Sequence, residues 1–261
     1  MCLIVLAWHV VPGVPVIAAA NRDEFYDRPA TPAGPWPGAP HVIAGRDLQG
    51  GGSWMGLSLR GAAGPRFAAL TNIRAPSERR LDAPSRGALV ADFLNEDIGA
   101  PEYLRRIVER GDVYNGYNLV LGDGEALYWY SNRGDADPRN GQPLERGRIY
   151  GISNGLLDAP WPKVLRTKAQ FASLLCQGAP EDAYFEMLAD TTRAPDGRLP
   201  ETGMPIEVER MLSPVCIESP GYGTRTSTVV KLYVGAAPEL HERVVQPGGG
   251  RDPVTDCSLD R

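Results

Sequence analysis

Two almost uninterrupted apolar runs at the start of the chain, residues 2–11 and 15–21, constrain the fold more than any other feature. The junction between them reads Val-Pro-Gly-Val-Pro, and proline and glycine together favour a turn. Short runs rich in valine, isoleucine and leucine are typical of strands, so the sequence predicts a β-hairpin. Because polar residues do not alternate along either run, we expect a sheet that is covered on both faces.

The same segment also has to be compared with a targeting sequence, because it ends in three alanines at 18–20. A secretory signal carries positive charge before its apolar region, and the first twenty residues contain neither lysine nor arginine. A membrane-spanning helix needs about 20 uninterrupted apolar residues, and Pro12, Gly13 and Pro15 divide this run. We therefore expect a hairpin here and no integral membrane segment.

The overall charge and the cysteines disfavour several functional classes. A net charge of −5 disfavours a protein that holds nucleic acid through its overall charge. The four cysteines, at positions 2, 176, 216 and 257, form no Cys-x-x-Cys pair, and the chain has only three histidines. We therefore expect no metal site, and we expect a reducing, cytoplasmic location.

The rest of the chain predicts strands, two helices, strands, two helices and strands, in that order. Further strands are expected near residues 41–45, 53–60, 66–72, 117–122, 126–131, 147–153, 224–235 and 239–246. Helices are expected near residues 85–95, 101–110, 161–176, 180–190 and 205–212. Residues 27–40, with five prolines, and residues 74–86 are expected to be loops. This order favours an α+β fold with two sheets between helical layers, formed by one domain over 1–247 with a flexible tail at 248–261.

Cys2 directly follows the initiator methionine and is the first candidate for chemistry. Removal of Met1, which a small second residue permits, would leave Cys2 with a free α-amino group. Such a group has a pKa of about 7.7–8.0 and can accept the thiol proton near neutral pH. One residue would then be both nucleophile and base. The alternative is a small apolar side chain buried on a strand.

A dense polar cluster, Asn-Arg-Asp-Glu at 21–24, ends the second apolar run. The hairpin would return it to the neighbourhood of Cys2. There Arg22 would favour the thiolate, and Asp23 or Glu24 would hold the arginine or the α-ammonium in place. The alternative is an ordinary solvated turn.

Asparagines end two of the predicted strands, Asn72 after Phe-Ala-Ala-Leu-Thr and Asn154 after Ile-Tyr-Gly-Ile-Ser. Their amide N–H groups suit an oxyanion hole, although asparagine is also common where strands end. Arg225 opens a later strand and could pair with a substrate carboxylate, or simply begin a polar strand. The glycine-rich run at 50–56 lacks a phosphate-loop pattern and predicts a tight turn that passes close to a neighbour.

Nine short motifs, in order along nearly the whole chain, resemble the NRDE family, also described as transport and Golgi organization protein two-like. They are M-C at 1–2, N-R-D-E at 21–24, G-G-S-W-M-G at 51–56, L-T-N-I-R at 70–74, S-R-G at 85–87, Y-N-L-V at 117–120, G-I-S-N-G at 151–155, P-W-P-K-V at 160–164 and G-T-R-T-S-T-V at 223–229. The family in turn resembles N-terminal nucleophile (Ntn) hydrolases of the cysteine type, such as bile salt hydrolase and penicillin V acylase.

That resemblance implies a four-layer αββα sandwich with Cys2 as nucleophile and base. It implies that Asn154 holds the α-amino group and the oxyanion, and that Arg225 lies near the nucleophile. Arg22 is shifted by one position from the arginine of those hydrolases, and Asp23 and Glu24 both remain candidates for the acidic position.

Two functions follow from these residues and this resemblance. The first is hydrolysis or transfer at a non-peptide amide C–N bond through a thioester on Cys2, which needs no cofactor and takes a small-molecule amide. The second, implied only by the resemblance, is a non-enzymatic protein that binds and moves haem, with links to lipid or acyl-coenzyme A metabolism. His9 lies inside an apolar run, where a packed core histidine is expected rather than a haem ligand.

Overall fold

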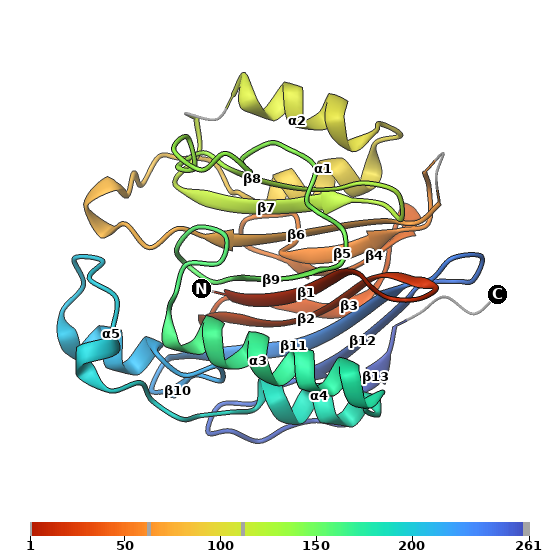
Figure 1. Ribbon diagram of the computed structural model, residues 1–261. Helices are drawn as coiled ribbons and strands as arrows, with labels where there is room; N and C mark the ends of the chain where they lie inside the picture. Colours follow the sequence, from red (N-terminus) through yellow and green to blue (C-terminus); the bar gives the residue numbers. More distant parts are fainter. Residues whose placement is uncertain (1, 62–63, 111–112, 258–261) are drawn as a thin grey trace.

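The computed structural model describes residues 2–61, 64–110 and 113–257 and has a mixed α+β architecture (Figure 1). Two antiparallel sheets face each other, and five α-helices lie around them within the described part of the chain. This agrees with the expected fold class at the level of two antiparallel sheets with helices packed on them.

The first sheet contains the N-terminal hairpin. Its strands are β1 (Cys2–Val11), β2 (Val14–Phe25), β9 (Arg148–Ile152), β10 (Glu218–Ser219), β11 (Tyr222–Leu232), β12 (Glu239–Val244) and β13 (Thr255–Asp256). They follow the order β13-β12-β11-β2-β1-β9, and β10 pairs with β11. The predicted hairpin is confirmed, because Cys2 pairs with Arg22 and Leu6 pairs with Ala18.

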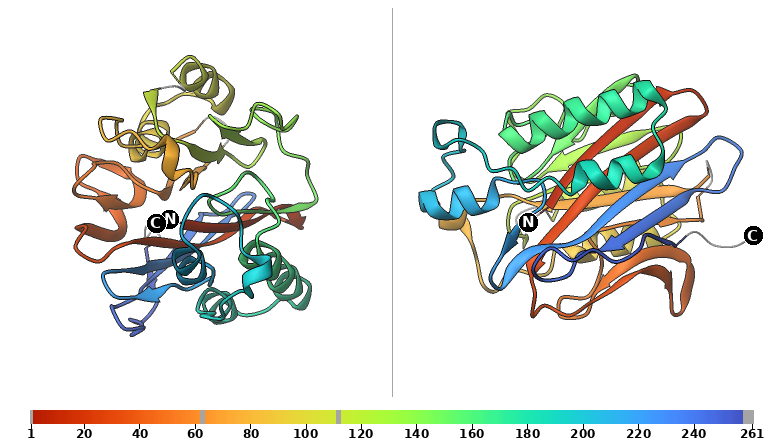
Figure 2. Two further views of the ribbon diagram at one scale, coloured as in Figure 1. Left: turned by 90° about the vertical axis from the view of Figure 1, so that its left-hand side faces the viewer. Right: turned by 90° about the horizontal axis from the view of Figure 1, so that it is seen from below.

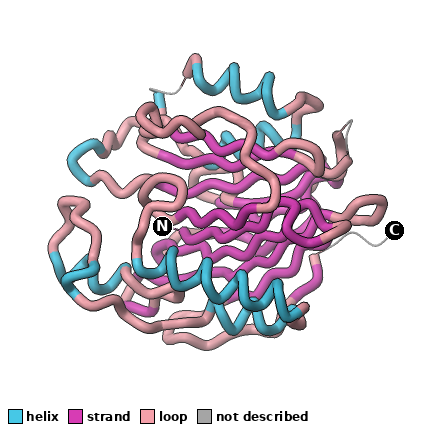
Figure 3. Tube along the Cα trace, in the orientation of Figure 1, coloured by secondary structure: helices cyan, strands magenta, loops and turns pink. Residues whose placement is uncertain are grey.

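The second sheet keeps its strands in chain order. They are β3 (Ala30–Trp36), β4 (Ala39–Asp47), β5 (Met55–Ser58), β6 (Arg66–Asn72), β7 (Tyr117–Gly122) and β8 (Leu127–Ser131). The helices are α1 (Gly87–Asn95), α2 (Ala100–Val108), α3 (Pro162–Gln177), α4 (Glu181–Leu188) and α5 (Ile206–Leu212), with short 3-10 turns at Pro76–Glu78 and Asp196–Arg198. Figure 3 separates these helices from the strands by colour.

Both faces of β1 are buried, as the continuous apolar run predicts. Ile4 and Leu6 face the second sheet, whereas Leu3 and Val5 pack with side chains of α3 and α4. On the other side of the molecule, α1 and α2 cover the outer face of the second sheet. Figure 2 gives two further views of the sheets and of the helices that cover them. Because side chains alternate along a strand, Cys2 lies on the same face as Ile4, toward the second sheet.

The proline-rich segment 27–40 is not the irregular loop that its composition predicts. It contains β3 and the start of β4. Proline cannot donate a ladder hydrogen bond and is tolerated at edges and bulges. Here β3 is the edge strand of its sheet, and its pairing with β4 is interrupted by two register shifts. Position at an edge is a tertiary property that composition does not reveal.

The segment after Gly248 also differs from the expected flexible tail. Thr255 and Asp256 form β13 against β12, the amide of Cys257 donates to the carbonyl of Leu240 at 2.8 Å, and Cys257 is buried. The tail is therefore packed as far as Cys257, and the rest of it lies outside the described residues. None of the described helices combines the length and the apolar character that crossing a membrane requires.

Candidate functional site

A pocket of about 410 Å³ opens where the two sheets meet the loop before α1. Antiparallel pairing places the start of β1 beside the end of β2, and β6 ends opposite them in the second sheet. We call this cavity the Cys2 pocket. Its wall includes Cys2, Arg22, Trp54, Asn72 and Arg86. The structure thus brings together five of the residues that the sequence singled out, from three strands: Cys2 on β1, Arg22, Asp23 and Glu24 on β2, and Asn72 on β6.

Cys2 is partly exposed at the pocket, and its carbonyl accepts a hydrogen bond from the Ser153 hydroxyl at 3.1 Å. Burial of the thiol raises its pKa above the ordinary value; the carboxylate of Asp23 adds to this effect, and the positive charge of Arg22 opposes it. The thiol is therefore protonated near neutral pH and needs a base before it can act as a nucleophile.

Arg22 lies across from Cys2 and is held by contacts on two sides. Its guanidinium is 4.4 Å from the centre of the Trp54 ring, and one of its nitrogens is 3.7 Å from a carboxylate oxygen of Asp47. Burial would raise the pKa of Asp47, but the amide of Gly50 and the guanidinium of Arg28 hydrogen-bond to it and hold the pKa below its usual range. Asp47 therefore stays ionised and fixes a buried positive charge beside the thiol.

Asp23 and Glu24 point to opposite faces of β2, although both contribute to the pocket. The buried carboxylate of Asp23 accepts a hydrogen bond from the Thr224 hydroxyl at 2.6 Å. Burial raises its pKa, and the charge of Lys163 opposes that shift. Glu24 is more exposed and lies 3.8 Å from Arg28. Asp23 thus belongs to the interior under Cys2, whereas Glu24 belongs to the rim.

The first residue of the Asn-Arg-Asp-Glu cluster has a structural role. The buried Asn21 amide donates to the carbonyls of Leu188 and Val215, and its oxygen accepts a hydrogen bond from Ser227. It therefore ties β2 to α4 and β11, and faces away from the pocket.

The two strand-end asparagines meet across the gap between the sheets. The side-chain amide of Asn154 donates to the backbone carbonyl of Asn72 at 2.9 Å, and the amide of Arg74 donates to the carbonyl of Asn154 at 2.8 Å. The carboxamide of Asn72 itself lines the pocket and has no hydrogen-bond partner within the described residues. Asn72 is therefore the amide that is free to bind a ligand, and Asn154 positions its backbone.

Arg225 does not line the Cys2 pocket. A register shift between Thr224 and Thr226 interrupts the pairing of β11 with β2, and the Arg225 guanidinium donates to the carbonyls of Phe25 and Arg28. It braces the end of β2 and the turn that follows. The sequence could not show this, because a bulge changes the face on which a side chain lies.

Arg86 is a pocket residue that reasoning from the sequence gave no role. It is the N-cap residue of α1 and donates to the carbonyl of Gly116 at 2.9 Å. Burial lowers the pKa of Arg86 to about 10, although the Cys2 thiolate, where it forms, and the carboxylate of Glu24 oppose the shift. It therefore places a second partly desolvated cation in the pocket with Arg22.

The glycine-rich run contacts this same helix start, as predicted for a tight turn passing a neighbour. Gly52 has a φ of +77°, and a Cβ there would overlap the backbone of Gly87. The amide of Ser53 donates to the Gly87 carbonyl at 3.1 Å. Both segments carry motifs of the resemblance, but the sequence alone does not show that they meet.

A buried charged network lies behind the pocket, and no role was predicted for its members from the sequence. Arg74 and Glu209 form an ion pair with side chains only 2% and 3% exposed, and Arg74 stacks on Trp161 at 4.7 Å. The ammonium of Lys163 donates to the carbonyl of Leu212 at 3.0 Å. Burial lowers the pKa of Lys163 to about 8, although Asp23 opposes the shift.

The pocket offers one side chain of the kinds that bind haem iron. Among its described lining residues there is no histidine, methionine or tyrosine, so Cys2 would be the only axial ligand. His9 lies near the other end of β1, where its Nε2 is 3.0 Å from the Gly124 carbonyl. A haem bound in this pocket and a nucleophilic function would thus compete for the same sulfur.

Comparison with known proteins places the chain in a family. The family model described as Transport and Golgi organisation 2 matches residues 1–247. A bovine protein named Transport and Golgi organization protein 2 homolog is 36% identical over 255 residues, which is 91% of this chain and 88% of the bovine protein. The human homolog is 37% identical over 234 residues, 82% of this chain and 81% of its own length, and the Drosophila protein is 29% identical over 256 residues, 88% of this chain and 87% of its own length. With a family model over most of its length and relatives above 30% identity, this chain belongs to the Transport and Golgi organisation 2 family.

Proposed function

We propose that the protein catalyses acyl transfer from a non-peptide amide, with Cys2 as the nucleophile. The observation that carries this proposal is that the Cys2 thiol lines a pocket together with two buried or half-buried arginines and a carboxamide without a partner. Arg22 and Arg86 stabilise a thiolate, and Asn72 offers a donor for an oxyanion. The helices packed on the outer faces of two facing sheets support a hydrolase of the Ntn type.

The reaction requires prior removal of Met1, which exposes the α-amino group of Cys2. That amine takes the thiol proton as the sulfur attacks the carbonyl carbon, and a C–S bond forms. The oxyanion of the tetrahedral intermediate accepts a hydrogen bond from Asn72. The C–N bond then breaks, the leaving amine takes the proton from the α-ammonium, and a thioester remains on Cys2. Water or a second nucleophile releases the acyl group.

The environment of the α-amino group supports this division of roles. Asp23 lies inside the protein under Cys2 with a carboxylate fixed by Thr224, and it can hold an ammonium in place. The four cysteines are all free, which supports action in a reducing compartment such as the cytoplasm.

The first test is the intact mass of the purified protein, which should correspond to a chain that begins at Cys2. Retention of Met1 would exclude the mechanism for this chain. The second is trapping with a panel of fluorogenic acyl amides, in which acid quenching should preserve a mass increase on the N-terminal peptide. Cys2→Ser should abolish turnover and the thioester. Cys176→Ser, which removes an exposed thiol elsewhere, should retain both.

A further inference from the structure

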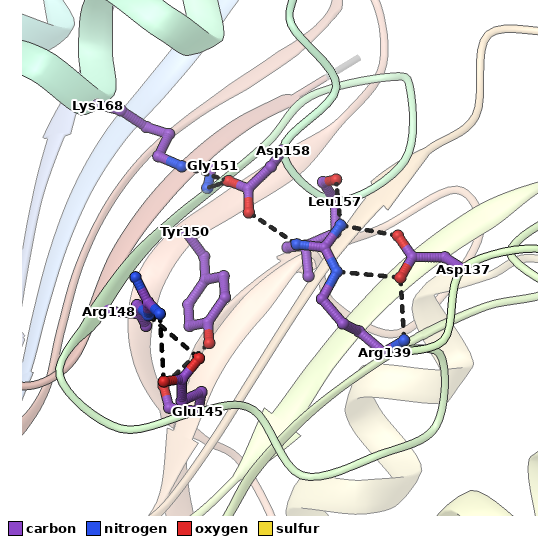
Figure 4. A network of polar contacts seen from close by, with 9 residues as sticks. All are labelled: Asp137, Arg139, Glu145, Arg148, Tyr150, Gly151, Leu157, Asp158 and Lys168. Carbon is purple, nitrogen blue, oxygen red and sulfur yellow. Dashed lines mark hydrogen bonds and ion pairs between the residues drawn. The ribbon is translucent and has the colours of Figure 1, made fainter.

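Two large cavities differ in how their charges are compensated. The second, of about 500 Å³, is lined by Arg139, Arg148 and Lys168 among others. Figure 4 shows that each of these cations already faces a carboxylate: Arg139 faces Asp137 and Asp158, Arg148 faces Glu145, and Lys168 faces Asp158. Among the described residues that line it, this cavity therefore has no cation without a carboxylate partner that could attract a ligand.

The Cys2 pocket has an excess of positive charge. Its described lining contains five arginines and three carboxylates. The arginines are Arg22, Arg28, Arg79, Arg80 and Arg86, and the carboxylates belong to Asp23, Glu24 and Asp47. Asp47 and Glu24 neutralise the charges of Arg22 and Arg28, and Asp23 is turned toward Thr224.

The remaining positive charge is concentrated on the segment before α1. The side chain of Arg79 makes no hydrogen bond or ion pair with any described residue. Arg86 donates only to the Gly116 carbonyl and faces no carboxylate within salt-bridge distance in the described chain. Burial lowers the pKa of Arg86, and the charges of Arg79 and Arg28 lower it further. An anion between them would remove this repulsion.

We propose that Arg79 and Arg86 bind a carboxylate or phosphate group of the molecule that occupies the Cys2 pocket. The identification of this molecule as the acyl donor rests on the proposed acyl transfer, whereas the anion site does not. The substrate class is then an amide that carries an anionic group on the side of the pocket formed by residues 79–87.

Competition between two alkylating reagents tests the site without any knowledge of the substrate. In both reactions the thiolate of cysteine attacks the methylene carbon, a C–S bond forms and iodide leaves. Iodoacetate is an anion and iodoacetamide is neutral, so the ratio of their rates cancels the thiolate fraction and reports the local charge. Exposed Cys176 in the same molecule serves as the reference thiol, and peptide mass spectrometry reads both sites.

We expect the iodoacetate-to-iodoacetamide ratio at Cys2 to exceed that at Cys176 by about tenfold at low salt, because clefts of one sign concentrate counter-ions. The difference should shrink in 1 M salt, where the Debye length is about 3 Å. Arg79→Gln and Arg86→Gln should lower the ratio, and Arg86→Lys should retain most of it. Arg193→Gln, which removes an exposed charge outside the pocket, should leave it unchanged.

Protection experiments distinguish the two sources of the anion. If added inorganic phosphate slows the labelling of Cys2 by iodoacetate and acetate at equal ionic strength does not, the site binds a phosphate. If acetate slows the labelling and phosphate does not, the site binds a carboxylate. The proposal would be overturned if the ratios at Cys2 and Cys176 were equal, or if neither glutamine variant changed the ratio at Cys2. Retained Met1 or a missing thioester would refute acyl transfer alone and leave the alkylation result standing.

Discussion

Replacing Glu209 by glutamine tests whether the buried ion pair behind the pocket holds the site in place. The Arg74–Glu209 pair is almost completely excluded from solvent, and Thr202 also donates to Glu209. Glutamine has nearly the same shape, so the substitution removes one charge and leaves the Arg74 guanidinium buried without its carboxylate. Loss of one partner of a buried pair costs about 3–5 kcal/mol.

For a chain of this size, a loss of about 3 kcal/mol in the free energy of unfolding lowers the melting temperature by roughly 6 °C or more. Urea denaturation followed by far-ultraviolet circular dichroism measures the free energy of unfolding directly. Glu207→Gln on the same helix is the matched control, because its pair with Arg210 is exposed, 76% for Glu207 and 34% for Arg210. We expect little change in that variant.

A double variant separates unpaired charge from lost packing. Arg74→Met combined with Glu209→Gln leaves no isolated cation and should recover part of the stability lost in Glu209→Gln. A cost for Glu209→Gln no larger than that of Glu207→Gln would refute the reasoning. The reasoning would also be refuted if the two substitutions were additive. In that case the free energy of unfolding of the double variant would lie below that of Glu209→Gln by the full cost of Arg74→Met alone.

Three further predictions concern the pocket and its surroundings. Asn72→Ala should lower kcat by about 10²–10³-fold with little loss of stability, because its carboxamide has no described partner; equal losses in kcat and stability would contradict this. The pKa of Lys163 is lowered by burial from 10.5 to about 8, so the unfolded chain binds more protons between these values and stability rises with pH there. Lys163→Met should flatten that rise, whereas equal pH slopes in the two proteins would contradict it. Haemin titration at micromolar protein should give no saturable Soret shift; a shift that Cys2→Ser abolishes and Cys176→Ser retains would instead support haem binding.

The sequence predicted the elements that depend on local pattern better than those that depend on neighbours. The apolar runs of β1 and β2 specify a hairpin and its burial, and they bring Arg22 opposite Cys2. The edge position of β3 could not be read from its prolines, because pairing with one neighbour only is decided by the sheet.

The same limit applies within the site. Arg225 lies outside the Cys2 pocket because of a bulge in β11, and no residue pattern predicted that bulge. Arg86 enters the pocket because Gly52 and Gly87 allow two distant segments to touch. Each motif was visible in the sequence, but which motifs come into contact is a property of the folded chain.

The pairing of β2 with β11 has a consequence for how the protein is made. Asn21 and Ser227 are hydrogen-bonded but 206 residues apart in sequence. At about 5–20 residues per second, the ribosome needs on the order of 10–40 s to add that length. During this interval β2 lacks one of its two neighbours, so the first sheet is still incomplete on that side. If the proposed removal of Met1 takes place, we therefore expect it to occur on the nascent chain, before this sheet is complete.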